Sequence, residues 1–371
     1  MFNTKNEQLD DLLRRICESL QVTPTMYALA ESRYKAVADW LDRWDEPMQL
    51  QIYPQGSFRI GTTVKPIKGE EFDLDFVCEF SVPWQSQNPH LVLQKMYNRM
   101  KEHGTYQGMV ELKRRCIRVN YRNEFHMDIL PAFPVDDTGC LKVPDRELGW
   151  KDSNPKGYAE WFEEQGTIQK MEFVDKRAEV EPLRGHETAE EKTILAKIVQ
   201  LIKRHRDVSF EDDLDNAPIS IVLTTLAAKH YAGHRSVFQG LLHIVNAISI
   251  DIVAVGNGRI QVLNPRNSAE DLSERWDGNR KLYSLFVDFV RKFQNELMSV
   301  QHAVGIDAAS KLLMSMFGEN VTQTALRKQA EAMQNYRTTG KLAVNSKGTL
   351  TSAAVVGSTL VKGNTFFGSE E

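Results

Sequence analysis

The sequence predicts a two-lobed α+β protein, with a mixed sheet in its first half and a helical lobe in its second. Three observations support this prediction. Two helical segments come first, ending near Trp44. Between about residues 50 and 130, apolar and polar residues alternate as in strands. From about Thr188 to Met333, apolar residues recur instead at the spacing of a helix face.

The N-terminal helices are predicted from apolar spacing and a cap. Leu9, Leu12 and Leu13 share one face of a helix over about residues 6–20, and Thr23-Pro24 is a typical helix start. We expect both helices to brace the sheet, so the first unit spans residues 1–185.

The remaining chain divides into a helical lobe and a tail. The lobe spans residues 186–338, and residues 339–371 are rich in Gly, Ser, Thr and Asn, which predicts a flexible C-terminal tail. Its aromatic pair, Phe366-Phe367, could dock on a partner, although a tail without a role is the interpretation that we favour.

Composition limits the classes of function. The chain has 371 residues, of which 42% are hydrophobic, and 46 Lys and Arg against 50 Asp and Glu leave a formal charge of -4. This balance gives no general attraction to nucleic acid or to an anionic membrane, so any phosphate binding must be local. The four cysteines form no CxxC pair, and neither a signal peptide nor an apolar run of about 18 residues occurs. We expect a cytoplasmic protein with no membrane association.

The segment FDLDFVCEF, residues 72–80, is predicted to be a strand with one acidic face. Asp73 and Asp75 lie on that face, and the intervening apolar residues lie on the other. A hairpin of residues 116–121 and 125–130 follows and carries Asp128. Three converging carboxylates would suit Mg²⁺. Taken without the other motifs, Asp73 and Asp75 could instead simply be exposed acids on a solvated strand face.

A glycine-serine turn upstream favours a binding site over that alternative. Gly56-Ser57 opens the stretch GSFRIGT, predicted to be a loop after a short strand at residues 50–52, and glycine allows close approach of a phosphate. Lys65 and Lys68 follow and could contact phosphate, but solvated loop lysines are the favoured interpretation.

The strings GSFRIGT, EFDLDFV and HMDILPAF resemble the bacterial CD-NTases, which are related to cyclic GMP-AMP synthase and oligoadenylate synthase and belong to CBASS antiphage operons. The segment VLNPRNSAEDLSERW, residues 262–276, resembles a further stretch of that family. The resemblance implies a polymerase-β-like nucleotidyltransferase core with mixed sheet and helices. It also implies that the helical lobe binds substrate, as in cyclic GMP-AMP synthase and oligoadenylate synthase.

The resemblance assigns roles to five residues of the first half. Gly56 and Ser57 match the turn that contacts the donor phosphates, and Asp73, Asp75 and Asp128 match the catalytic metal triad. Two Mg²⁺ ions are expected, for which Mn²⁺ can substitute. Asp73 and Asp75 would bridge both ions, and Asp128 would hold the ion at the attacking hydroxyl.

Two residues of the helical lobe are expected to contact the donor triphosphate. The helix TILAKIVQLIKRHRD carries basic residues from Lys197 to Arg206 beside an apolar stripe, and a solvated charged face is the alternative. Because this helix and the following APISIVLTTLAAKHY resemble the substrate-binding lobe of the family, we expect Lys203 and Ser220 to contact phosphate.

Three histidines have competing interpretations. His126 shares a strand face with Asp128 and could line the site, but a plain hydrogen-bonded histidine is favoured. His230 and His234 have the spacing of two zinc ligands on a helix, yet Gly233 interrupts them and no CxxC follows, so zinc is disfavoured.

By resemblance, the chain is expected to make a cyclic di- or trinucleotide from ATP, GTP or other nucleoside triphosphates, releasing pyrophosphate. The product would activate a separate effector, and a ubiquitin-ligase-like or other regulatory partner could act at the tail. An RNA-extending enzyme of poly(A)- or CCA-adding type is the first alternative, but it needs a basic track that a charge of -4 does not favour. A catalytically silent nucleotide-binding scaffold is the second, and it has no need for three mutually repelling acids.

Overall fold

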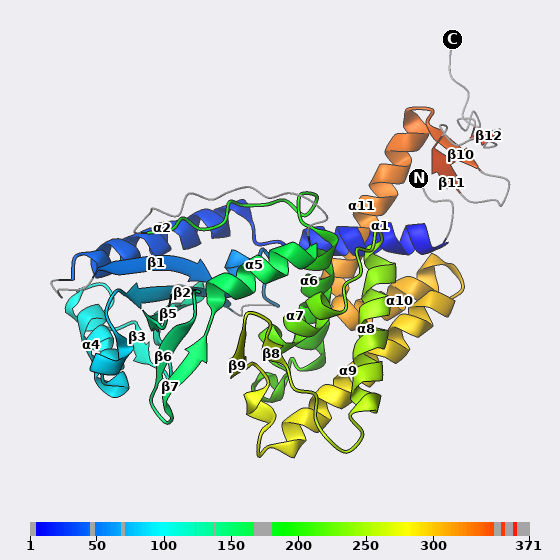
Figure 1. Cartoon of the computed structure of the whole chain (residues 1–371). Coiled ribbons are helices and arrows are strands. Elements are labelled where there is room, and N and C mark those ends of the chain that lie inside the picture. The colour runs from blue at the N-terminus through cyan, green and yellow to red at the C-terminus, as the bar shows by residue number, and fades with distance from the viewer. Residues whose placement is uncertain are drawn as a thin grey trace, which may run out of the picture.

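The computed structural model describes residues 5–44, 49–67, 71–122, 124–136, 138–166, 180–344, 350–352 and 359–361. Its chain forms two packed units, each with its own hydrophobic core. In Figure 1, one unit is a sheet covered by helix α2 (Pro24–Asp42), and the other is a bundle that contains α6 to α10.

Within the described residues, seven strands form one mixed sheet, in the order β1-β2-β5-β4-β3, with β6 pairing with both β5 and β7. Only β2 and β5 pair in parallel among these strands. The strands are β1 Leu50–Gln55, β2 Phe72–Phe80, β3 Val110–Leu112, β4 Ile117–Tyr121, β5 Phe125–Pro134, β6 Leu141–Asp145 and β7 Gly149–Ser153. The predicted acidic strand and hairpin are therefore confirmed as β2, β4 and β5.

Helix α2 begins where the sequence predicts. Thr23 is its N-cap, with Oγ1 accepting a hydrogen bond from the backbone N–H of Met26 at 3.2 Å, and Pro24 occupies the first turn. Its buried face, which includes Tyr34 and Leu41, packs in one core with strands β1 and β2. The same core includes α4 (Pro89–Glu102), which the sequence analysis did not predict.

The second unit is mainly helical. Its elements are α1 Lys5–Ser19, α5 Pro155–Gly166, α6 Ile194–Ser209, α7 Ser220–Lys229, α8 Val237–Ala254, α9 Arg280–His302, α10 Gly305–Phe317 and α11 Glu319–Thr338, with 3-10 turns Leu214–Asn216 and Glu274–Trp276 and the hairpin β8 Leu263–Asn264 and β9 Asn267–Asp271. Helix α8 is long and apolar enough to cross a membrane by length and composition alone, but it packs against α1, α6 and α9 inside this unit.

The two N-terminal helices belong to different units, which differs from the prediction that both brace the sheet. Leu12, Leu13 and Ile16 of α1 are buried in the core of the helical unit. The α1 residue Asp11 also accepts a hydrogen bond from Gln329 of α11 at 2.9 Å. The apolar face of α1 is thus covered by helices that lie later in the chain.

The predicted tail begins at the end of α11. Three short strands, β10 Leu342–Val344, β11 Leu350–Ser352 and β12 Thr359–Leu360, form a small sheet where the sequence predicted no regular structure. Phe366, Phe367 and Lys68 lie outside the described residues.

Candidate active site

A cavity of about 680 Å³ lies between the two units, within the size range of ligand pockets. Six of the seven predicted site residues line it, although they come from distant parts of the chain: Gly56, Ser57, Asp73, Asp75, Lys203 and Ser220. The sheet contributes an acidic wall, carrying Asp73 and Asp75. Helix α6 contributes Lys203 and Arg206, here called the basic wall, although Asp207 pairs with Arg206 and also lines the cavity.

The acidic wall follows from strand geometry. Phe72 and Leu74 are buried in the sheet core, whereas the side chain of Asp73 is 59% exposed and that of Asp75 is half-buried. In the parallel pair of β2 and β5, Asp75 lies opposite Asp128. Register therefore brings the three predicted acids to neighbouring positions of one sheet face.

Arg118 holds the third acid, and the sequence analysis missed this residue. Its Nε and Nη2 donate to Oδ1 and Oδ2 of Asp128, each at 2.7 Å, and Nη2 also lies 3.5 Å from Oδ1 of Asp73. Arg118 is the register partner of Asp128 in the antiparallel pair of β4 and β5. The predicted hairpin would have indicated this pairing had its register been counted.

The electrostatics of the acidic wall favour a cation. Burial raises the pKa of Asp75 well above its usual range, and repulsion from Asp73 and Asp128 raises it further. The pKa of Asp73 is also raised, by partial loss of solvent inside the cavity and by repulsion from Asp128, against the opposing effect of Arg118. Carboxylate oxygens are the donors that Mg²⁺ prefers, so the acids fit a divalent cation by type and position. Across the described ranges, however, no group of three acidic, histidine or cysteine side chains is arranged so that it could hold one metal ion. Both oxygens of Asp128 accept from Arg118 instead.

Gly56 lies against Asp75 and has no room for a side chain. Its φ is +62°, and an added Cβ would lie 2.4 Å from Oδ2 of Asp75. The sequence analysis predicted a loop here, but Gly56–Arg59 forms the short helix α3. The Oγ of the next residue, Ser57, accepts a hydrogen bond from Oγ1 of Thr63 at 3.1 Å.

Two of the five basic residues of α6 face the cavity, namely Lys203 and Arg206. Lys203 is only 8% exposed, and its Nζ donates to the carbonyl of Thr62 at 3.1 Å. Burial, together with the nearby Arg206, lowers the pKa of Lys203 to about 8. Ser220, at the first turn of α7, lies on the same wall.

The other basic residues of α6 do not line the cavity, contrary to the prediction of a face that offers cations. Lys197 lies beside Cys17 of α1. Arg204 donates to the carbonyl of Lys65 at 2.6 Å, and His205 packs against Phe293. Helix α6 is buried on several sides, so its polar residues serve different neighbours.

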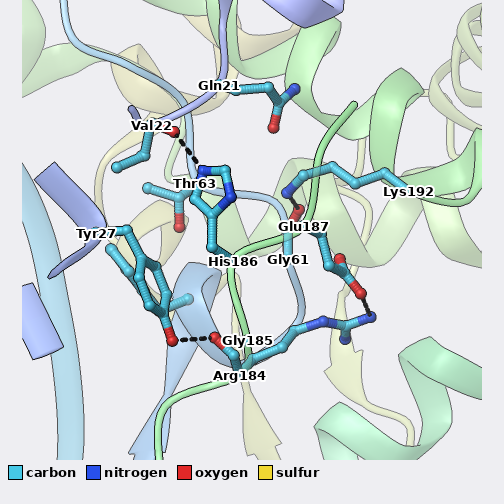
Figure 2. A pocket seen from close by; sticks show the side chains of 11 residues that line it. Gln21, Val22, Tyr27, Gly61, Thr63, Arg184, Gly185, His186, Glu187 and Lys192 are labelled. Carbon is cyan, nitrogen blue, oxygen red and sulfur yellow. Dashed lines mark hydrogen bonds and ion pairs between the residues drawn. The ribbon is translucent and has the colours of Figure 1, made fainter. Parts of the chain in front are cut away.

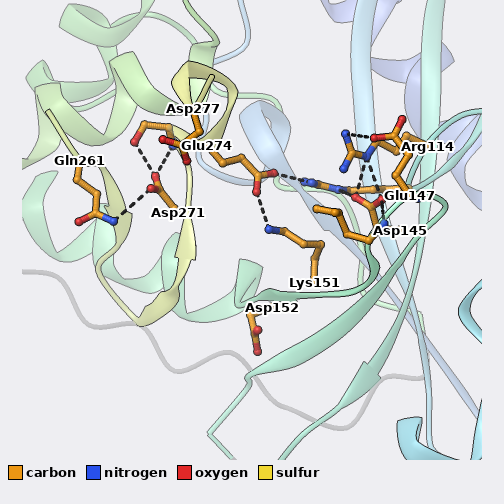
Figure 3. A network of polar contacts seen from close by, with 12 residues as sticks. Arg114, Asp145, Glu147, Lys151, Asp152, Gln261, Asp271, Glu274 and Asp277 are labelled. Atoms are coloured by element: carbon orange, nitrogen blue, oxygen red, sulfur yellow. Dashed lines mark hydrogen bonds and ion pairs between the residues drawn. The ribbon is translucent and has the colours of Figure 1, made fainter. Parts of the chain in front are cut away.

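A polar network joins the two units at one rim of the cavity (Figure 3). Glu274, in the 3-10 turn after β9, accepts hydrogen bonds from Lys151 of β7 and from Arg115, which precedes β4. Nearby, Glu270 of β9 accepts from Ser153 at 3.0 Å and from Asn264 at 2.6 Å. Asn264, Glu270 and Glu274 all belong to the segment of residues 262–276 that resembles the family, so this segment forms part of the rim.

The three histidines considered in the sequence analysis, His126, His230 and His234, contact protein side chains. The Nδ1 of His126 lies 2.9 Å from Oε2 of Glu71, and the Nε2 of His230 lies 2.8 Å from Oδ2 of Asp251. The His234 ring lies 4.8 Å from that of His243. Over the parts of the chain that the structure describes, no metal-binding group includes His230 or His234.

Comparison with known proteins agrees with this geometry. Residues 7–166 match the Second Messenger Oligonucleotide or Dinucleotide Synthetase domain. A protein named c-di-GMP synthase from Roseivirga ehrenbergii is 33% identical, over 97% of both chains. The CD-NTase CdnG of Bradyrhizobium diazoefficiens, solved with GTP, superimposes with a TM-score of 0.72 at 21% identity, over 87% of this chain and 99% of that one. The CdnC of Escherichia coli, solved with a HORMA protein, has a TM-score of 0.60 at 12% identity, over 83% of this chain and 96% of that one.

The fold, a mixed sheet with a helical second lobe, is that of solved CD-NTase structures, as predicted. The chain belongs to the bacterial CD-NTases, of the kind related to cyclic GMP-AMP synthase and DncV. It is therefore an enzyme that makes a cyclic oligonucleotide from nucleoside triphosphates, and this prediction is confirmed over the RNA-extending and silent alternatives. Nucleotidyltransferases generally use divalent cations.

Proposed function

We propose that the chain joins two GTP molecules into the cyclic dinucleotide c-di-GMP. One observation carries the proposal: the acidic wall, the Gly56-Ser57 turn, Lys203 and Ser220 line one cavity. The relative that is similar over 97% of both chains is named a c-di-GMP synthase, which supports both a two-membered ring and guanine as the base.

Each bond-forming step has the same chemistry. A ribose hydroxyl oxygen of one nucleotide forms a bond to the α-phosphorus of the other. The bond from that phosphorus to the oxygen bridging the α- and β-phosphates breaks. Pyrophosphate and the hydroxyl proton are released. The first step gives a linear dinucleotide, and the second closes the ring. Catalysis in this scheme depends mainly on positioning and on charge stabilisation.

Asp73, Asp75 and Asp128 are proposed to hold two Mg²⁺ ions, or Mn²⁺ in their place. When bound, these ions lower the pKa of the attacking hydroxyl and neutralise the triphosphate. The neighbouring positions of the three acids on β2 and β5 and the raised pKa of Asp75 support this assignment. Arg118 would release Asp128 on metal binding, since both oxygens of Asp128 are occupied by this arginine.

The turn and the basic wall are proposed to bind the donor triphosphate. Ser57 and Ser220 offer hydroxyl groups, and Lys203 has N–H donors beyond the one used by Thr62. Lys203 is buried beside the cavity, so its interaction with phosphate would be weakly screened by water.

The product is proposed to act on a separate effector in CBASS antiphage signalling, in the cytoplasm and without membrane association. A regulatory protein partner, of ubiquitin-ligase-like or other kind, is a further expectation. The HORMA complex of Escherichia coli CdnC shows that one relative assembles with another protein.

The test is to incubate purified protein with each labelled nucleoside triphosphate, and with all four, in the presence of Mg²⁺. Products are treated with phosphatase and resolved by chromatography and mass spectrometry. A phosphatase-resistant product with the mass of c-di-GMP, formed from GTP alone, is the expected result. A cyclic product containing another base would overturn the guanine assignment, and growth of added RNA in place of a cyclic product would contradict the proposed reaction.

A further inference from the structure

The loop that follows the Gly56-Ser57 turn is held by side chains of the helical unit. Four carbonyls in the segment 61–65 accept hydrogen bonds from four side chains in or just before α6. The pairs are Lys192 to Gly61, Lys203 to Thr62 at 3.1 Å, Gln200 to Thr63 at 2.7 Å and Arg204 to Lys65 at 2.6 Å. Figure 2 shows the first of these contacts, between Lys192 and Gly61, at a small cavity that both residues line.

The held loop is in turn bonded to Ser57. The backbone N–H of Thr62 donates to the carbonyl of Ser57 at 2.9 Å, and Oγ1 of Thr63 donates to its Oγ at 3.1 Å. Thr62 and Thr63 are both buried, and the hydroxyl bond between Thr63 and Ser57 lies at the wall of the cavity. A continuous chain of hydrogen bonds therefore runs from α6 through the loop to Ser57.

Packing attaches this loop to the helical unit as well. Ile60 is buried in the core of the helical unit, and Val64 packs against the same core. Phe58, by contrast, is buried in the core of the sheet. The turn thus spans the two cores, whereas Asp73 and Asp75 lie on the sheet alone. Ser57 also lies two residues after Gln55, the last residue of β1 and the register partner of Asp75, so the sheet holds one side of the turn and α6 holds the other through the loop. The separation between Ser57 and the acids therefore depends on both supports.

Gln200 is placed to control that separation without touching the cavity. Its side chain is 0% exposed, and it is not among the residues that line the cavity. Its Nε2 donates to the carbonyl of Thr63, and its Oε1 accepts from Nε2 of Gln21 at 3.0 Å. A buried amide whose donor and acceptor are both used has one favoured orientation.

We propose that Gln200 is a positioning residue, which through Thr63 sets the place of Ser57 opposite the aspartates and so the affinity for the donor triphosphate. This inference deepens the proposed function and relies on Ser57 being a phosphate contact. It assigns to α6 a second task beside the direct contact by Lys203. Misplacement of a contact by about 1 Å can reduce a rate about a hundredfold, so the loop needs such support.

The test compares Gln200→Met with the matched control Gln329→Met. Gln329 is also a buried glutamine of the helical unit, and its Nε2 bonds to Asp11 and to the carbonyl of Gln8, away from the cavity. Binding of inorganic tripolyphosphate with Mg²⁺ is measured by calorimetry, and melting temperature is measured for each variant. Gln200→Met is expected to bind about tenfold more weakly than wild type, and Gln329→Met is expected to bind as wild type.

A second variant, Thr63→Val, removes the hydroxyl bond to Ser57 with little change in shape and is expected to weaken binding in the same direction. It decides the question if Gln200→Met does not fold. Unchanged binding in Gln200→Met and Thr63→Val, or equal weakening in Gln329→Met, would overturn the inference. Wild-type protein that binds tripolyphosphate but forms no cyclic product would contradict the proposed function and leave the inference standing.

Discussion

The acidic wall and the basic wall line the same cavity, but different structural elements place them. The acids lie on adjacent strands, where Asp75 and Asp128 are register partners in a backbone ladder. Lys203 comes from a helix, and its contact with Thr62 joins residues 141 positions apart. The positions of the acids follow from pairing between strands of one sheet, whereas the position of Lys203 in the cavity depends on how the two units pack.

This difference suggests separate tasks for the two walls. A sheet register cannot shift by one residue without turning its side chains to the other face, so the acids keep fixed spacing. The helical unit is joined to the sheet through loop carbonyls and through polar bonds such as Lys151 to Glu274. We expect the sheet to set the chemistry and the helical unit to set triphosphate affinity.

The largest effect is expected from the acidic wall. The change Asp73→Asn with Asp75→Asn should reduce cyclic product at least about a thousandfold, because the charges that are proposed to hold metal are lost. Removing metal with a chelator should abolish product to a similar extent. Product is measured by mass spectrometry. The melting temperature without metal should not fall, since burial and repulsion already disfavour the charged form of Asp75. A large fall would mean that the acids have a structural role.

The next effect is expected where the two walls meet. Gly56→Ala should reduce product about a hundredfold, because the new Cβ would collide with Asp75 and displace the turn. Gly108→Ala is the matched control, since nothing lies within 4 Å of its added Cβ. The initial rate of product formation is measured for both. Similar rates in the two variants would show that the turn tolerates displacement.

A smaller effect is expected from Arg118→Gln, which removes the charge that balances Asp128. Stability without metal should fall by about 1–3 kcal/mol, since a hydrogen-bonded charge loses its partner. Mn²⁺ should then stabilise this variant more than wild type, because no arginine competes for Asp128. Urea unfolding with and without Mn²⁺ measures both quantities. Arg114→Gln, which loses an ion pair to Asp145, is the control and should show the wild-type response to Mn²⁺.

The smallest effect concerns pH and the basic wall. The pKa of Lys203 is lowered to about 8, so its ammonium is present below that pH and is lost as pH rises through it. We expect the KM for GTP to increase about tenfold between pH 7 and pH 9. In Lys203→Arg this increase should be absent, because arginine stays protonated in that range. A parallel increase in both enzymes would assign the titration to another group.

The same contrast explains which parts of the site the sequence predicts. Alternation in FDLDFVCEF predicts the face of Asp73 and Asp75, and the hairpin predicts that of Asp128. That the three acids form one group was expected from the family resemblance, because strand period does not say that β5 lies beside β2. Helix α6 offered no such rule. Its buried Arg204 and His205 look in sequence like a solvated face, and only packing shows which neighbours they serve.

Parts of the fold were missed for similar reasons. The start of α4 carries a readable signal, because Asn88 caps the helix and Pro89 occupies its first turn, yet the sequence analysis did not use it. Strand β7 has no such signal, since all its residues are half-buried and show no alternation. Its place depends on pairing with β6 and on contacts to the β8–β9 hairpin.

The position of α1 has a consequence for how the chain folds during synthesis. This helix is made before the helices that cover it, since its partners include α11, and Lys328 donates a hydrogen bond to Glu18 across 310 residues. The apolar face of α1 therefore cannot be buried against α11 until most of the chain has been made. A fragment that stops at residue 185 would expose Leu12, Leu13 and Ile16, so we expect it to aggregate, whereas the full chain closes on itself.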